Sequence, residues 1–177
     1  MSTPSSGSGL KTFTAVIAVI FGLVLLIGGI YLAVLGGSWY YIIAGLLFIA
    51  TAVLLQKLKS TALIVYALLV LGTVIWGLWE VGSDFFALAP RLDILGLFGL
   101  WLLIPAVTRG FDNAKSAKLV LTGSLAVTIA VMIFAVFNDP QEIRGELSSK
   151  QPATAQSIPG VADGDWPAYG RTQSGLR

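Results

Sequence analysis

The stretch 12–56 contains no charged residue, and this limits what the chain can fold into. A single helix of that length would rise roughly 65 Å, about twice the thickness of the hydrocarbon core of a bilayer. The stretch must therefore break, and the pair Gly36–Gly37 favours a turn. The pattern predicts two apolar helices, over residues 13–35 and 39–56, with the aromatic run Trp39–Tyr41 at a membrane–water boundary.

The composition points to the same class of protein. Of the 177 residues, 56% are hydrophobic and only 11% are charged, whereas a soluble domain has about a quarter of its residues charged. The net charge of +2 comes without a basic stripe, which argues against nucleic acid as a partner. The sequence has no cysteine and no histidine, which excludes disulfides, imidazole metal ligands and nucleophiles activated by histidine.

Three further apolar segments follow, over residues 60–79, 90–107 and 119–137. We place Pro90 at the first position of the middle segment, where a missing N–H costs nothing. The sequence therefore predicts an all-α membrane protein with five transmembrane helices (residues 13–137) and a mostly irregular external C-terminal tail.

The first apolar helix carries small residues at seven-residue spacing, namely Ala15, Gly22, Gly29 and Gly36. Small residues on one face let a neighbouring helix approach closely. We favour packing within the chain as the explanation. A dimerisation face is the alternative.

The short loops differ in charge. On the N-terminal side they hold six basic residues, and on the opposite side a single one, Arg91; the six are Lys11, Lys57, Lys59, Arg109, Lys115 and Lys118. Because basic loops stay in the cytoplasm, residues 1–12 are predicted to be a cytoplasmic tail. Residues 138–164, rich in proline and polar side chains, are then a linker on the outer side, which is the periplasm if the membrane is the inner membrane of a Gram-negative bacterium.

One polar group lies close to the predicted membrane, where Glu80, Asp84, Arg91 and Asp93 follow the aromatic pair Trp76 and Trp79. Anchoring at the interface, with Arg91 paired to an acid, is the simpler interpretation. The alternative is the rim of a quinone site, formed by Trp76, Trp79, Glu80, Arg91 and Asp93, because a quinone needs hydrogen-bond partners beside an apolar surface.

Four segments carry a family resemblance: GGSWYYIIAGL (36–46), GTVIWGLWEVGSDFFALAPRLDIL (72–95), FNDPQEI (137–143) and DWPAYGR (165–171). In this order and spacing they resemble the N-terminal membrane anchor of the quinoprotein glucose dehydrogenases, which depend on pyrroloquinoline quinone (PQQ), and of related polyol and quinate dehydrogenases. The resemblance implies five transmembrane helices followed by a periplasmic propeller that binds PQQ and calcium and passes electrons to ubiquinone.

In that family the cofactor, calcium and catalytic residues lie in the propeller, so the resemblance assigns no catalytic, cofactor-binding or metal residue to this chain. It implies that residues 165–177 are the start of a truncated propeller domain. We therefore expect the membrane-anchor portion of a PQQ-dependent dehydrogenase for glucose or a related sugar or polyol. The alternative is a free-standing structural membrane subunit that docks a separate periplasmic partner.

Overall fold

The structure, a computed structural model, describes residues 6–138. This part of the chain is helical and contains no strand, which confirms the predicted all-α class. The predicted linker, apart from Asn138, and the predicted propeller start at 165–177 lie outside the described residues. The helices are α1 (Ser6–Val34), α2 (Tyr40–Gln56), α3 (Thr61–Val81), α4 (Phe85–Leu102), the short α5 (Pro105–Thr108) and α6 (Ala114–Phe137).

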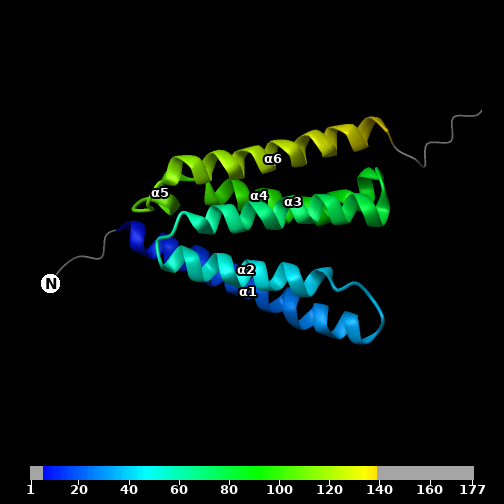
Figure 1. Cartoon of the computed structure of the whole chain (residues 1–177), viewed down its shortest axis with the longest axis horizontal. Coiled ribbons are helices and arrows are strands. Elements are labelled where there is room, and N and C mark those ends of the chain that lie inside the picture. Colours follow the sequence, from blue (N-terminus) through cyan, green and yellow to red (C-terminus); the bar gives the residue numbers. More distant parts are fainter. Residues whose placement is uncertain (1–5, 139–177) are drawn as a thin grey trace, which may run out of the picture. The chain divides into compact units, whose positions relative to one another are not determined.

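Consecutive long helices lie side by side and alternate in direction, as Figure 1 shows. Helices α1 and α2 form a closely packed hairpin, and α3 contacts α2, α4 and α6. The short α5 packs against α1. This arrangement brings the connecting segments to two opposite ends of the bundle.

One end, the basic end, combines the start of α1, the α2–α3 loop and the segment from α5 to the first turns of α6. Two hydrogen bonds join these pieces, since Lys11 Nζ donates to the carbonyl oxygen of Arg109 and the Ser60 N–H donates to Asp112 Oδ1 at 3.1 Å. The bond from Ser60 lowers the pKa of Asp112. All six basic residues of the predicted cytoplasmic side belong to these segments.

The opposite end, the aromatic end, combines the α1–α2 loop, the α3–α4 turn and the end of α6. The Ser83 hydroxyl donates to the carbonyl oxygen of Asn138 at 2.9 Å and so joins the turn to α6. The basic loops and the loops of mixed charge, which the sequence assigned to two different sides, thus lie at opposite ends of the bundle.

The prediction of five spanning helices needs a correction. Among the described residues four helices, α1, α3, α4 and α6, are long and apolar enough to cross a membrane. Helix α2 is apolar but has only 17 residues. Its start follows the predicted break, since Gly36 adopts a positive φ of 82° that favours glycine.

Two helices begin earlier than predicted. Helix α1 starts at Ser6, so Lys11 lies inside the helix and not in a tail, and α6 starts at Ala114 and so includes Lys115 and Lys118. The prediction began each helix near the last charged residue. Lysine is a good helix former, and its long side chain reaches water from the first turns of a membrane helix.

The predicted helix over residues 90–107 is also wrong in both bounds. Helix α4 begins at Phe85, because Asp84 caps it by accepting a hydrogen bond from the Ala87 N–H at 3.2 Å. Pro90 therefore lies inside α4 and not at its first position. The helix ends at Leu102, and Pro105 begins α5 after an extended residue, as expected before proline.

Three of the four small residues, Ala15, Gly22 and Gly29, pack within the chain, as we favoured, whereas Gly36 lies in the loop after α1 and a Cβ atom there would meet open space. A Cβ atom added at Gly29 would lie 2.7 Å from the backbone nitrogen of Ile42, and one added at Gly22 would lie 3.0 Å from the Gly45 carbonyl oxygen. Glycines on both helices thus let the two backbones approach closely. Ala15, one turn nearer the basic end than Ala18, is buried as well.

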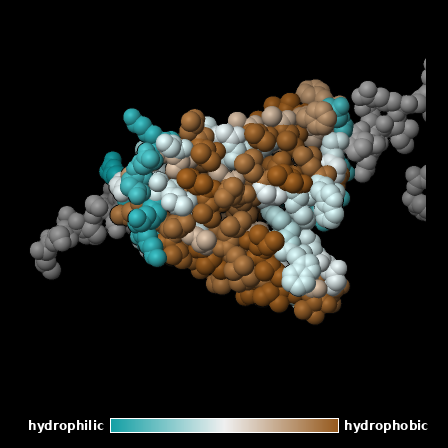
Figure 2. Space-filling view, viewed as in Figure 1, coloured by the Kyte–Doolittle hydropathy of each residue, from teal (hydrophilic) through white to brown (hydrophobic). Residues whose placement is uncertain are grey.

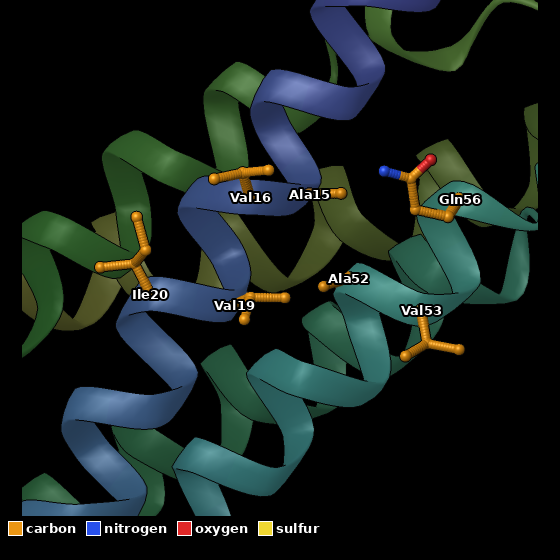
Figure 3. Close-up of a pocket in the computed structure, with 7 residues that line it drawn as sticks. All are labelled: Ala15, Val16, Val19, Ile20, Ala52, Val53 and Gln56. Carbon is orange, nitrogen blue, oxygen red and sulfur yellow. The ribbon is translucent and has the colours of Figure 1, made fainter.

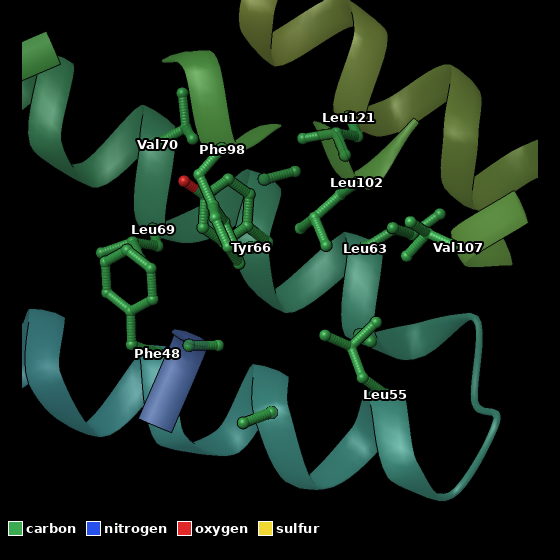
Figure 4. Close-up of a cluster of buried hydrophobic side chains, with 14 of the residues drawn as sticks. Phe48, Leu55, Leu63, Tyr66, Leu69, Val70, Phe98, Leu102, Val107 and Leu121 are labelled. Atoms are coloured by element: carbon green, nitrogen blue, oxygen red, sulfur yellow. The ribbon is translucent and has the colours of Figure 1, made fainter. Parts of the chain in front are cut away.

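An aromatic cluster fills the centre of the bundle (Figure 4). The ring of Tyr66 lies 5.6 Å from that of Phe48 and 5.4 Å from that of Phe98, so α2, α3 and α4 meet there. The Tyr66 hydroxyl donates to the carbonyl oxygen of Leu95 at 2.7 Å, which satisfies a polar group that burial would otherwise penalise.

The outer surface is apolar over the middle of the bundle. In Figure 2 hydrophobic side chains cover this region and hydrophilic ones gather at the ends, most densely at the basic end. Large apolar side chains such as Ile27, Ile75 and Ile133 are exposed on three different helices. A band of this kind suits the hydrocarbon core of a membrane.

The glycine contacts generate a prediction with a control in the same helix. Gly29→Ala forces a methyl group against the backbone of α2 and should lower the free energy of unfolding by about 1–3 kcal/mol. Gly28→Ala meets open space and should not destabilise the protein. Thermal unfolding in detergent measures both variants, and equal melting temperatures would show that the α1–α2 contact tolerates a methyl group.

Candidate functional site at the aromatic end

A three-residue turn positions the polar residues singled out in the sequence. Gly82 ends α3 with a positive φ of 66°, and its N–H donates to the carbonyl oxygen of Leu78. Asp84 then caps α4. Because the turn is short, the last turn of α3 and the first two turns of α4 lie against each other.

Arg91 reaches back across this turn. Its Nη2 atom lies 3.1 Å from Glu80 Oε2, and its Nη1 atom donates to the carbonyl oxygen of Ala87. The side chain of Arg91 is 27% exposed and that of Glu80 is 35% exposed, so water still screens the ion pair. The Nε atom of Arg91 is buried and has no hydrogen-bond partner.

Trp76 lies at the centre of the site. The ring of Tyr40 stacks on it at a centroid distance of 4.0 Å with an angle of 6° between the planes. Tyr41 meets it edge to face at 5.4 Å, and Arg91 Cζ lies 5.5 Å from its centroid. The indole is therefore held by two aromatic rings and a cation, and its Tyr40-covered face is closed to any other ring.

A hydrogen bond between two hydroxyls fixes the position of Tyr40. Its phenolic oxygen bonds Thr73 Oγ1, and Thr73 in turn donates to the carbonyl oxygen of Leu69 at 2.7 Å. Tyr40 is the first residue of α2, so these bonds join the start of α2 to the middle of α3. The hydrogen bond to Thr73 thus helps to hold the Tyr40 ring in its stacked position on Trp76.

The structure brings together three of the five predicted rim residues, Trp76, Glu80 and Arg91. Trp79 lies next to them in the chain but is 84% exposed. Asp93 is exposed and takes no part in the ion pair with Arg91. These two residues present an apolar ring and a carboxylate outward from the same end of the bundle.

Three further residues belong to the site and were not predicted as members, namely Tyr40, Tyr41 and Thr73. The aromatic run that contains the tyrosines already marks a membrane boundary in the sequence. That signal places them at the same depth as Trp76. It does not indicate which ring stacks on which.

The described residues contain no cluster of metal-binding side chains. Among residues 6–138 no three of the side chains of His, Cys, Asp and Glu come close enough to hold a metal ion.

Taken together, the fold and the site define a class: an all-α membrane protein whose apolar bundle carries an aromatic and charged surface at one end. The chain is 62% identical over 177 residues to quinoprotein glucose dehydrogenase A of Acinetobacter calcoaceticus, covering 100% of this chain and 22% of that protein. It is 52% identical over 169 residues to the quinoprotein glucose dehydrogenase of Escherichia coli (strain K12), covering 95% of this chain and 21% of that protein.

A third relative is a smaller protein. Over 103 residues the chain is 36% identical to the glycerol dehydrogenase small subunit of Gluconobacter thailandicus, covering 56% of this chain and 81% of that subunit. The chain therefore belongs to the family formed by the N-terminal membrane region of quinoprotein glucose dehydrogenases and by these small subunits. It spans about a fifth of the length of the two glucose dehydrogenases. No family model and no solved structure matches the chain.

The cap that starts α4 allows a direct test of how the site is positioned. Asp84→Ala removes the acceptor of the Ala87 N–H and should lower the free energy of unfolding by about 1 kcal/mol. Asp93→Ala removes the same charge from an exposed position of the same helix and should change it by less than about 0.5 kcal/mol. Denaturation in mixed detergent measures both. Equal losses would mean that the cap does not hold the helix start.

Proposed function

We propose that this chain is the membrane-anchor portion of a PQQ-dependent dehydrogenase that oxidises glucose or a related sugar or polyol and passes electrons to ubiquinone. The observation that carries the proposal is the match of the whole chain to quinoprotein glucose dehydrogenases. The helical bundle with its apolar surface suits the anchoring role. In this proposal PQQ and calcium are bound by a propeller domain outside these residues.

The distribution of charge supports an orientation in a bacterial inner membrane. The basic end, with its six basic residues and the one acid Asp112, would face the cytoplasm. The aromatic end would face the periplasm, and so would the residues that follow α6. Electrons from a periplasmic domain would then reach the membrane at the aromatic end.

We also propose that α2 spans the membrane as a fifth helix despite its length. Its first residue, Tyr40, contacts Trp76 at the aromatic end, and its last residue, Gln56, precedes the loop at the basic end. A helix of 17 residues rises roughly 26 Å, close to the thickness of a bilayer core. The lysines after its C-terminal end and the aromatic rings at its N-terminal end would lie at the two membrane–water boundaries.

Ubiquinone would meet the anchor beside the α3–α4 turn, on the rim formed by Trp76, Trp79, Glu80, Arg91 and Asp93. Trp79 offers an exposed apolar ring, and Arg91 offers a partly exposed cation. A hydrogen bond from a cation to a quinone oxygen would favour uptake of electrons by that oxygen. Since Tyr40 covers one face of Trp76, we assign stacking on the quinone ring to Trp79 in preference to Trp76.

A second candidate function is a free-standing structural membrane subunit that docks a separate periplasmic partner. The specific observation in its favour is the match over 81% of the glycerol dehydrogenase small subunit of Gluconobacter thailandicus. Both candidates assign the same membrane role to residues 6–138. They differ in whether the catalytic domain is part of the same polypeptide.

The orientation and the fifth span are tested by one set of fusions. Reporters that are active on only one side of the membrane, joined at Ser60, Gly82, Asn113 and Asn138, should place Ser60 and Asn113 in the cytoplasm and the other two outside. A reporter at Gly37 should also be external if α2 spans. Cytoplasmic activity at Gly82 would contradict the orientation, and activity of the Gly37 and Ser60 fusions on the same side of the membrane would contradict the fifth span.

The quinone rim is tested in a complete dehydrogenase that carries this region. Arg91→Ala should lower reduction of ubiquinone by about tenfold, because it removes a charged hydrogen-bond donor. Sugar oxidation with an artificial dye as acceptor should stay unchanged. Arg109→Ala, an arginine at the opposite end, is the matched control and should leave both activities intact. Unchanged ubiquinone reduction in Arg91→Ala would contradict the quinone rim and favour the interpretation that these residues anchor the protein at the membrane interface.

A further inference from the structure

A hollow lies between α1 and α2 near the basic end of the bundle (Figure 3). Its volume is about 230 Å³, and its walls are the side chains of Val19 and Ala15 from α1 and of Ala52 and Val53 from α2. Gln56, one helical turn closer to the basic end, is the polar residue of the lining. The hollow is therefore an apolar groove with one polar end.

The groove lies where the two helices face each other with small residues. Further along the hairpin the backbones touch through Gly22 and Gly45, where even an added methyl group would clash. At the groove Ala15 and Ala52 are small, and Figure 3 shows the side chain of Val19 pointing from α1 toward α2.

Two basic residues lie close in the chain to the polar end of this groove. Lys11 lies four residues before Ala15 and so on the same face of α1, and Lys57 directly follows Gln56. Lys11 Nζ uses one of its three donors on the Arg109 carbonyl oxygen, which holds the ammonium group in place and leaves two donors available.

The charge at this end is not neutralised by the part of the chain that the structure describes. Asp112 is the one acidic residue of the basic end, and its Oδ1 atom accepts the Ser60 N–H. Against it stand the six basic residues named above. An anion would therefore meet a positive field at the mouth of the groove.

We propose that this groove binds one anionic phospholipid, with an acyl chain between α1 and α2 and the phosphate group beside Lys11 and Lys57. The apolar walls would bind the acyl chain, and the two lysines would bind the phosphate group. A soluble phosphate has no use for the apolar walls, and a zwitterionic lipid gains little from two ammonium groups. The site lies at the opposite end from the quinone rim and goes beyond the proposed function, on which it does not rest.

The test uses the purified 177-residue chain in detergent, titrated with phosphatidylglycerol or with phosphatidylcholine of the same acyl chains and followed by native mass spectrometry. Phosphatidylglycerol should bind more tightly. The double variant Lys11→Gln/Lys57→Gln should weaken its binding by about 25-fold, since each lysine near a lipid surface contributes about fivefold. Binding of phosphatidylcholine should hardly change.

Two matched controls separate a site from a general surface effect. Lys115→Gln/Lys118→Gln removes the same charge from the first turns of α6 and should leave phosphatidylglycerol binding within about twofold of wild type. Val53→Phe fills the groove and should weaken binding of the lipid, whereas Leu46→Phe, seven residues earlier on α2, should not. Both α2 positions are exposed, so neither change disturbs the core.

Either of two results would overturn the proposal. One is equal affinity of the wild-type chain for the two lipids, which needs no variant and is independent of folding defects. The other is an equal loss in the two lysine double variants, which would mean that the lipid responds to the net charge of the basic end and not to the groove.

Discussion

The structure depends on keeping every polar group away from hydrocarbon. Backbone groups are satisfied inside the helices, and buried hydroxyls are satisfied by the same backbone. Thr51, Thr73 and Thr128 each donate to the carbonyl oxygen four residues earlier, at 2.7–3.0 Å. Such bonds need no partner from another helix. These buried threonines therefore satisfy their own donors, and the contacts between helices combine small and apolar side chains with hydrogen bonds such as that of Tyr40 with Thr73.

Charges other than Asp93, which is exposed halfway along α4, collect at the two ends of the bundle, and the ends differ in chemistry. The basic end holds lysines that project from helix starts and loops, joined by the bonds of Lys11 and Ser60. The aromatic end holds a compact arrangement in which Tyr40, Trp76 and Arg91 contact one another. The first suits a broad electrostatic attraction to anionic lipid. The second suits contacts with a particular ligand or protein.

The sequence predicts much of this arrangement because its strongest signals are local. The break at Gly36–Gly37 follows from two glycines and a run too long for one helix, and the structure confirms it. The start of α4 was mispredicted because the signals of proline and of an N-cap compete. Pro90 suits a first helical position, but Asp84 offers a hydrogen bond to a free N–H and so sets the start. Pro90 then lies beyond the first turn and leaves one carbonyl oxygen of that turn without its backbone hydrogen bond.

The candidate site was only partly predictable, because its main contacts join residues far apart in the chain. The pairing of Arg91 with an acid was expected, and the acid is Glu80. The stack of Tyr40 on Trp76 depends on how α2 packs on α3, which no local pattern specifies. Conversely, Asp93 looked equivalent to Glu80 in the sequence. Two residues after Arg91 on a helix, it faces another direction and stays exposed.

The side chain of Arg91 joins α4 to α3 through Glu80 and Trp76. A partly exposed ion pair such as that with Glu80 contributes about 0–1 kcal/mol. The contact with Trp76 adds about 0.5–1 kcal/mol at an exposed site, and the bond from Nη1 to the Ala87 carbonyl oxygen adds a further favourable term. Against these stands the buried Nε–H without a partner, which costs about 1–3 kcal/mol. In the proposed quinone rim, the partly exposed end of the guanidinium is the part that would meet an electron-rich oxygen.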